Sequence, residues 1–237
     1  MFKNLWGCFL ALAMFSTAVV VEAEESRNGC LEYIRQLKGR VDVAPVLLDV
    51  DLLKSGKTEK TLHMKGVKGD LTLQLYKGIF IKPTAIYAEG KGKLVTGSIA
   101  LGHYTPLYSK FVIFPEVGMT WSYLRTTIDI EPFGLFGLKE RFRSSSPFVG
   151  LEAYYYMTEK LTLMALYQYA WSSTHTKIKP IVSEHSHTCG PNYALMLDYK
   201  FASNWSATLG AGYNITLSKE KHGLRGKGLK AGVAYAF

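Results

Sequence analysis

From Leu71 to the C-terminus, apolar side chains recur at every second position in runs separated by polar segments. A period of two is typical of β-strands that have one apolar face. The pattern predicts eight strands, over residues 71–87, 94–104, 111–123, 148–156, 161–171, 193–201, 205–217 and 229–237. We therefore expect an all-β protein built from antiparallel strands.

The strand lengths favour a barrel that crosses a membrane. Most runs contain 9–13 residues, close to the roughly 9–11 residues that a tilted strand needs to cross a bilayer. The predicted connectors at 157–160 and 202–204 are short, whereas those at 129–146 and 172–190 are long. Short periplasmic turns and longer extracellular loops are typical of an up-and-down transmembrane β-barrel. We expect eight strands, with ten strands as the alternative.

The composition of the two strand faces supports the same interpretation. Over the later strands the predicted outward face carries almost no charge, and the other face is dominated by Gly, Ala, Ser and Thr. Aromatic residues gather near both strand ends, such as Trp121 and Trp171 at one end and Trp205 at the other. A soluble barrel would direct large aliphatic side chains inward and charges outward. Two aromatic belts are instead typical of a barrel with two membrane interfaces.

The N-terminus predicts export. Lys3 precedes an uncharged run from Leu5 to Val21, and a small residue, Ala23, follows. This order is typical of a secretory signal peptide, over residues 1–23. The alternative is an uncleaved anchor, because the run reaches the short limit of about 17 residues for a spanning helix.

Residues 24–70 differ from the rest of the chain. They show only weak alternation, and residues 54–70 carry five lysines against one Glu and one Asp. We expect a basic periplasmic extension here, with a further barrel hairpin as the alternative. The barrel itself is expected over residues 71–237.

The charge balance limits the partners. The chain carries +9 at neutral pH, and cleavage after Ala23 would remove one base and one acid. Such a balance suits an anionic surface such as lipid phosphate. No basic run is interleaved with aromatics, so no nucleic-acid partner is expected. Cys30 and Cys189 would remain after export, and the predicted topology puts them on opposite sides of the membrane, too far apart for a disulfide.

The last nine residues, LKAGVAYAF, resemble the C-terminal signature of bacterial outer-membrane β-barrels. The resemblance is to the class of small barrels like the OmpA membrane domain and covers residues 71–237. It implies a location in the outer membrane. It also implies that Leu229, Val233, Tyr235 and Phe237 form the signature that the barrel-assembly machinery reads.

Sparse charged and amide side chains fall on the predicted inward face. They are Glu116, Glu152, Gln168, Asp198, Lys200 and Lys230. An eight-stranded interior is just wide enough for side chains, so we expect these residues, with Lys82, to form a paired network that plugs the lumen. The alternative is a small polar conduit for ions, which ten strands would favour.

The segment 172–190 carries the candidate metal ligands. His185, His187 and Cys189 would offer imidazole and thiolate groups to zinc or copper. A solvated loop that contains three histidines by chance is the alternative and the expected one, so no metal or other cofactor is predicted.

Catalysis is not expected either. Ser172, Ser173 and His175 follow one strand at the outer rim, with Asp129, Glu131 or Glu184 as acids that would orient the histidine. No motif fixes their mutual distances. A lipid-A-modifying enzyme therefore remains only an alternative function.

The 129–146 segment combines apolar and cationic residues. The segment contains Leu135, Phe136, Leu138 and Phe142 together with Lys139, Arg141 and Arg143. Such a mixture fits lipid headgroups or a protein partner. A surface partner would bind through the 129–146 and 172–190 segments. The sequence thus predicts an outer-membrane barrel with a plugged lumen and a structural or surface-interaction role. The alternatives are a narrow porin-like channel, the lipid-A enzyme and a soluble periplasmic ligand-binding barrel.

Overall fold

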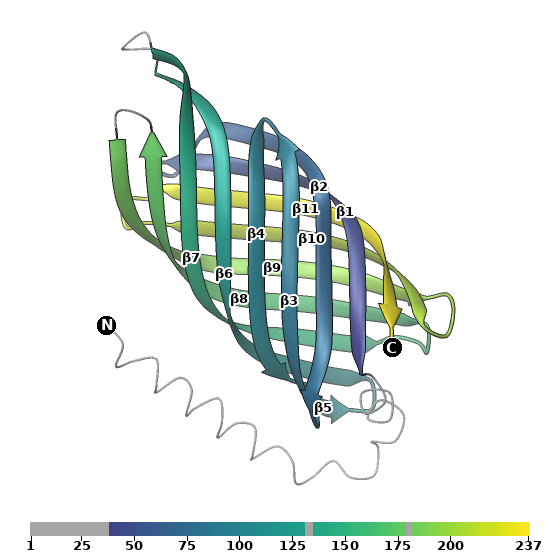
Figure 1. Ribbon diagram of the computed structural model, residues 1–237. Helices are drawn as coiled ribbons and strands as arrows, with labels where there is room; N and C mark the ends of the chain where they lie inside the picture. Colours follow the sequence, from purple (N-terminus) through teal and green to yellow (C-terminus); the bar gives the residue numbers. More distant parts are fainter. Residues whose placement is uncertain (1–37, 131–134, 179–181) are drawn as a thin grey trace, which may run out of the picture.

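The computed structural model describes residues 38–130, 135–178 and 182–237, which form one antiparallel sheet closed into a barrel (Figure 1). The strands are β1 (Gly39–Lys54), β2 (Lys57–Tyr76), β3 (Ile79–Gly90), β4 (Gly92–His103), β5 (Thr105–Tyr108), β6 (Phe111–Ile130), β7 (Leu135–Tyr156), β8 (Leu161–Ile178), β9 (Val182–Lys200), β10 (Trp205–Leu217) and β11 (Gly223–Ala236). Strands adjacent in sequence pair with each other except β4 and β5, which both pair with β6, and the β1–β11 and β4–β6 pairings complete the closure. The all-β antiparallel barrel predicted from the alternation is confirmed.

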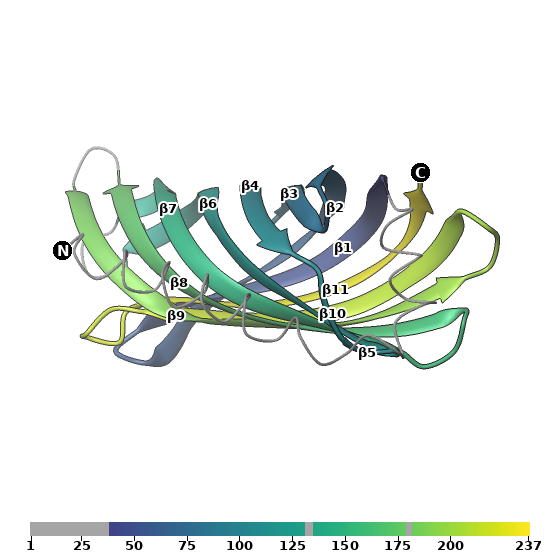
Figure 2. The ribbon, with the colours of Figure 1, turned by 90° about the horizontal axis from the view of Figure 1, so that it is seen from below.

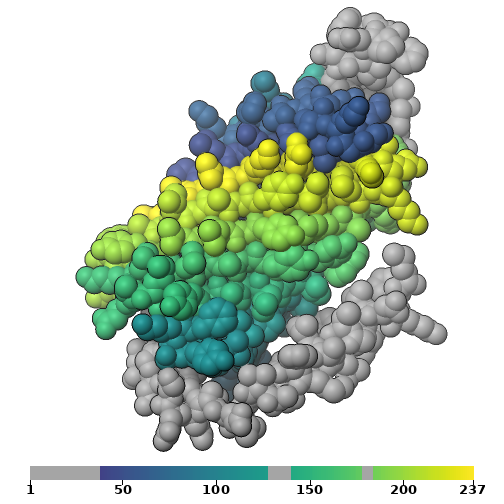
Figure 3. All heavy atoms as spheres, turned by 180° about the vertical axis from the view of Figure 1, so that it is seen from behind, coloured from purple at the N-terminus to yellow at the C-terminus, as the bar shows by residue number. Residues whose placement is uncertain are grey.

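The barrel wall contains ten strands, which was the alternative to the expected eight. The short strand β5 pairs with β6 just beyond the end of β4, so β4 and β5 together occupy one position in the wall. In Figure 1 the strands β2, β3, β4, β6 and β7 cross in front of β8–β11, as expected for strands inclined to a barrel axis. Figure 2 shows the whole barrel from below. Figure 3 shows its back, where β8–β11 lie side by side as successive bands from green to yellow.

The barrel has two ends, which we name by their connections. The C-terminal rim carries Phe237 and the turns at residues 77–78, 109–110, 157–160 and 201–204. The hairpin rim carries the turns at 55–56, 91 and 218–222, together with the far ends of the β6–β7 and β8–β9 hairpins. At the C-terminal rim the backbone N–H of Gly39 donates to the Phe237 carbonyl at 2.9 Å, so the final residue joins the first and last strands.

The predicted strand over residues 71–87 is wrong, because it contains the end of β2 and most of β3. The two strands are joined by a two-residue turn in which Lys77 and Gly78 both have positive φ, typical of a tight hairpin. A register shift between Gln74 and Tyr76 accompanies this turn. The shift keeps odd-numbered residues on the outward face of both strands, so the alternation runs through the turn unbroken.

Residues 39–70 form β1 and most of β2. This part of the chain is therefore the additional barrel hairpin that was the alternative, and not the expected periplasmic extension. The predicted loops at 129–146 and 172–190 are wrong as well. Most of both segments is strand, in the hairpins β6–β7 and β8–β9. In β8 both faces are polar from Ser172 to Lys177, which removes the alternation that would have indicated a strand there.

The exterior carries a broad apolar band. Large exposed side chains occur on every strand of the ten, among them Leu47, Val67, Tyr87, Ile99, Trp121, Leu151, Tyr167, Leu195, Leu209 and Leu229. Toward the hairpin rim the outward positions become charged at Asp49, Glu89, Arg125, Arg143 and Lys227. Among the described residues there is no helix of the length and apolarity that a transmembrane helix requires.

The predicted signal peptide over residues 1–23, Cys30 and Glu131 lie outside the described residues. The side chains of Asp129 and of residues 135–139 also lie outside the described part of the structure.

Candidate functional site

The lumen contains a cavity of about 1180 Å³. Its lining includes Lys110 and Glu159 at the C-terminal rim and Thr216 and Leu224 at the hairpin rim, so the cavity extends along the whole lumen. The side chains therefore do not fill the interior, contrary to the expected plug. The physical reason is the strand number, because the enclosed cross-section grows with each added strand.

All six predicted network residues line this cavity, but their partners differ in part from those expected. Glu152 pairs with Lys82, whose Nζ lies 2.5 Å from Glu152 Oε1. Tyr154 donates a further hydrogen bond to the same carboxylate. Lys82 Nζ also lies 4.8 Å from the centre of the Phe114 ring. This pair lies close to an aromatic cluster of the C-terminal rim.

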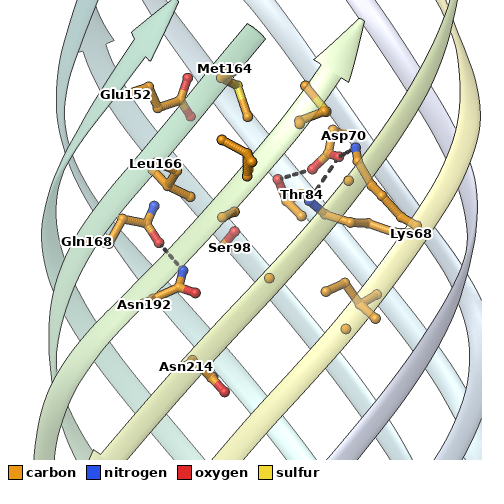
Figure 4. Close-up of a pocket in the computed structure, with 18 of the residues that line it drawn as sticks. Lys68, Asp70, Thr84, Ser98, Glu152, Met164, Leu166, Gln168, Asn192 and Asn214 are labelled. Atoms are coloured by element: carbon orange, nitrogen blue, oxygen red, sulfur yellow. Dashed lines mark hydrogen bonds and ion pairs between the residues drawn. The ribbon is translucent and has the colours of Figure 1, made fainter.

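Lys230 lies between two carboxylates of the segment that was expected to be a periplasmic extension. Its Nζ is 3.4 Å from Asp42 Oδ1 and 3.3 Å from Asp70 Oδ2. Asp70 also accepts from Lys68 at 3.0 Å and from the Thr84 hydroxyl at 2.8 Å (Figure 4). One wall of the cavity thus carries a chain of alternating charges from β1, β2 and β11.

The remaining predicted residues take other partners. Asp198 accepts a hydrogen bond from Arg40, another residue of the stretch expected to be an extension. Gln168 donates to Glu116 at 2.6 Å. It also accepts from Asn192 at 2.6 Å (Figure 4). Lys200, at the end of β9 and two residues from Asp198, also lines the cavity. The signal for Arg40 and Asp42 was weak, because β1 carries apolar residues on both faces and its alternation is hidden.

Two apolar clusters lie at different heights of the lumen. Near the C-terminal rim Phe80, Tyr104, Val112 and Phe114 pack together, with Tyr154 and Tyr156 against them. Nearer the hairpin rim a second cluster contains Leu52, Leu62, Met64, Ala88 and Leu124. Members of both clusters line the cavity, such as Tyr104 in the first and Leu124 in the second.

Asp51 and Arg225 form an ion pair near the hairpin rim, beyond the apolar band. Arg225 Nε donates to Asp51 Oδ2 at 2.8 Å, and the Thr61 hydroxyl donates to Oδ1 at 2.6 Å. The hydrogen bond from Thr61, and then the Arg225 guanidinium, hold the pKa of Asp51 below its ordinary value, against the opposing effect of burial.

Glu140 is buried in the same outer region, on β7. Burial, followed by the negative charge of Glu59, raises the pKa of Glu140 to about 7. Lys60 opposes this shift only in part.

The candidate metal ligands lie on the exterior. His185, His187 and Cys189 occupy successive outward positions of β9 and are exposed, so neighbours among them are about 7 Å apart along the strand. His185 instead meets His175 of β8, with 2.6 Å between His175 Nδ1 and His185 Nε2. Within the described ranges no group of three or more His, Cys, Asp or Glu side chains is placed to hold a metal ion.

The serine and histidine candidates for catalysis lie on different faces of the wall. Ser172 is buried, lines the lumen and exchanges a 2.6 Å hydrogen bond with Ser146. Ser173 and His175 follow at outward positions of the same strand. Desolvation, together with nearby His185, Lys177 and Arg143, lowers the pKa of His175. Ser172 and His175 are thus not brought together.

The C-terminal signature residues are arranged as an outward stripe. Leu229, Val233 and Phe237 are exposed to about half of their maximum, at 59%, 49% and 48%. The Tyr235 ring packs against Trp205, with 4.9 Å between centroids. This stripe belongs to the apolar band of the exterior.

No protein-family model and no curated protein sequence matches this chain. Among solved structures, the outer-membrane protease OmpT of Escherichia coli aligns with a TM-score of 0.56 at 12% identity, over 84% of this chain and 96% of OmpT. An identity this low establishes a shared fold and not a shared activity. The resemblance to bacterial outer-membrane β-barrels is confirmed at the level of the fold.

Two further structures align more weakly, and these alignments do not bear on function. An outer-membrane channel of Pseudomonas putida F1 has a TM-score of 0.47 at 9% identity, over 92% of this chain and all of the channel. Neisserial surface protein A has a TM-score of 0.44 at 9% identity, over 84% and 97% of the two chains.

Proposed function

We propose that this protein is an integral barrel of the bacterial outer membrane with a narrow, water-filled passage through its lumen. The membrane placement is supported by the exterior, where large apolar side chains stay exposed on every strand of the ten. In water such a continuous apolar surface would drive association. In a bilayer it faces acyl chains, and the closed sheet leaves no unpaired strand edge in the hydrocarbon.

The orientation follows from the two rims. The C-terminal rim has short turns and would face the periplasm, as in barrels of this kind. The hairpin rim, with the extended β6–β7 and β8–β9 hairpins, would face the outside. The barrel-insertion role of Leu229, Val233, Tyr235 and Phe237 remains a proposal based on the resemblance of LKAGVAYAF to the family signature.

The main support for the passage is the cavity of about 1180 Å³, which is lined by residues of both rims. The charged groups beside it are paired with one another, as in Lys82 with Glu152 and Lys230 with Asp42. Paired charges hold their side chains to the wall and leave the centre to water. The hydroxyl and amide groups of Ser146, Gln168 and Asn192 provide further polar lining. We therefore expect small ions and small polar solutes to pass.

We propose no catalytic role, since Ser172 and His175 occupy opposite faces of the wall.

Conductance in planar bilayers tests the passage. Gly212 lines the lumen, and a Cβ built there would meet only the Tyr193 carbonyl oxygen, at 3.6 Å. Gly212→Trp would place an indole in the cavity and should lower single-channel conductance at least about twofold. Ala211→Trp is the matched control, because the neighbouring residue on β10 faces the exterior.

The conductance measurement distinguishes a passage through the lumen from a purely structural or surface-interaction role. Steady conductance that falls only in Gly212→Trp supports the passage. An insulating wild-type barrel would overturn it and favour the structural or surface-interaction role through the outer hairpins.

A further inference from the structure

A row of cationic side chains crosses the exterior of four adjacent strands. Lys93 of β4 is directly opposite Arg125 of β6, Arg125 is opposite Arg141 of β7, and Arg141 is opposite Lys177 of β8. The intervening residues Leu94, Leu124 and Phe142 line the lumen, so these four cations point outward. Arg143 lies two residues from Arg141, one outward position nearer the apolar band. We call Lys93, Arg125, Arg141 and Lys177 the cationic row.

The cationic row is unfavourable without a counter-charge. Side chains directly opposite on neighbouring strands lie about 5 Å apart, and like charges there are destabilising. In the described part of the chain, none of the four side chains forms an ion pair with a carboxylate. Arg141 Nε is buried and has no hydrogen-bond partner among the described residues. A buried, unpartnered guanidinium N–H indicates a missing acceptor.

Glu89 is the only acidic residue directly opposite a member of the cationic row in the described strands, and it does not supply the missing acceptor. Glu89 of β3 is opposite Lys93, but its carboxylate accepts a 2.6 Å hydrogen bond from the Tyr87 hydroxyl. Lys93 itself lies over the Tyr87 ring, with 5.0 Å between Nζ and the centroid. The other three cations have no acid opposite them.

The surface beside the row identifies the kind of ligand. On the side of the C-terminal rim the same strands expose Val95 (42%), Ile99 (39%) and Trp121 (51%). Tyr123 lies between this apolar surface and Arg143, whose guanidinium is 5.8 Å from the ring centre. A ligand that satisfies both surfaces has an anionic head and an apolar tail.

We propose that the cationic row binds the phosphate groups of a phosphorylated lipid of the outer leaflet, with its acyl chains along Val95, Ile99 and Trp121. Guanidinium groups suit phosphate, because their planar N–H donors bind its oxygens in pairs. A free phosphate would use the cations but leave the apolar surface unused. The site lies on the exterior, so it depends on the proposed membrane placement and not on the passage.

Native mass spectrometry of the purified full-length barrel in detergent tests the site. The probes are lipid A with both phosphates, dephosphorylated lipid A, and inorganic phosphate as a competitor. The variant Arg125→Gln/Arg141→Gln/Lys177→Gln removes three charges of the row. The matched control Lys54→Gln/Lys57→Gln/Lys219→Gln removes three exposed lysines of hairpin-rim turns.

Wild type and control should bind the phosphorylated lipid equally, and the row variant at least about tenfold more weakly. Wild-type affinity in the row variant would overturn the proposal, as would equal binding of the dephosphorylated lipid. Displacement of the lipid by equimolar inorganic phosphate would identify a free-anion site and would also overturn it.

Folding is checked by the gel mobility shift on boiling. If the triple variant fails to fold, the exposed Lys177→Gln substitution alone should weaken lipid binding about threefold. Unchanged binding in Lys177→Gln would then count against the proposal.

Discussion

Lys82 of β3 and Glu152 of β7 form an ion pair across two intervening strands, with 2.5 Å between Lys82 Nζ and Glu152 Oε1. The inward residues beside Lys82 on those strands are Ala100 and Gly118. A Cβ at Gly118 would come within 2.4 Å of the Phe148 ring and of the Ile99 carbonyl oxygen, so no larger residue fits there. The absence of a side chain at Gly118 therefore leaves room for the Phe148 ring on the inner face of the wall.

Removal of one partner of this pair should destabilise the barrel. Lys82→Met leaves the Glu152 carboxylate buried without its cation, which should lower the free energy of unfolding by about 3 kcal/mol or more. Urea unfolding from lipid vesicles, followed by tryptophan fluorescence, measures this change. Lys54→Met, at an exposed position, is the control and should change the free energy by less than about 0.5 kcal/mol. Equal stability of the two variants would contradict the prediction.

The aromatic cluster at the C-terminal rim should be a second determinant of stability. Phe114 is fully buried against Tyr104, with 4.7 Å between ring centroids. Phe114→Ala should therefore lower the free energy of unfolding by about 3–5 kcal/mol. Tyr108→Ala, at a side chain that is 74% exposed, should have little effect in the same urea titration. A small loss in Phe114→Ala would show that the cluster adapts to the lost ring.

Asp51 should make the hairpin rim sensitive to acid. Its pKa in the folded barrel lies below the ordinary 3.8, so its stabilising effect is complete above that pH and is lost as pH falls through the folded pKa. Arg225→Gln should remove about 1–3 kcal/mol at pH 7. Amide hydrogen exchange of β1 and β11 at pH 7 and pH 3 measures the effect. Asp49→Asn, at an exposed pair with His63, should change exchange little at either pH.

Glu140 should act in the opposite direction. Its pKa in the folded protein is about 7, against an ordinary 4.5. Between these values the folded hairpin keeps a proton that the unfolded chain releases, so stability falls as pH rises from about 4.5 to 7. Glu140→Gln should slow amide exchange of β7 at pH 8 and leave it unchanged at pH 4. The exposed Glu184→Gln is the control, and equal effects in both variants would refute the prediction.

The sequence alone determined the barrel class, because alternation over many strands is a local property of the chain. In β8 and β10 one face contacts lipid and the other faces the lumen, so the two faces differ sharply in composition. The alternation along the sequence therefore predicted these strands. The inward position of Glu116, Glu152, Gln168, Asp198, Lys200 and Lys230 followed from the same parity.

The strand number, the side-chain partners and the cavity in the lumen depend on the three-dimensional closure of the sheet. In β1 both faces are apolar, since Val46 and Leu52 pack inside while Val43 and Leu47 face outward, so no alternation revealed the strand. The added hairpin brings Arg40, Asp42 and Asp70 to residues more than a hundred positions away, namely Asp198 and Lys230. It also widens the barrel beyond what side chains fill. Closure of a sheet is a global property, and one missed hairpin changes both its diameter and every pairing across it.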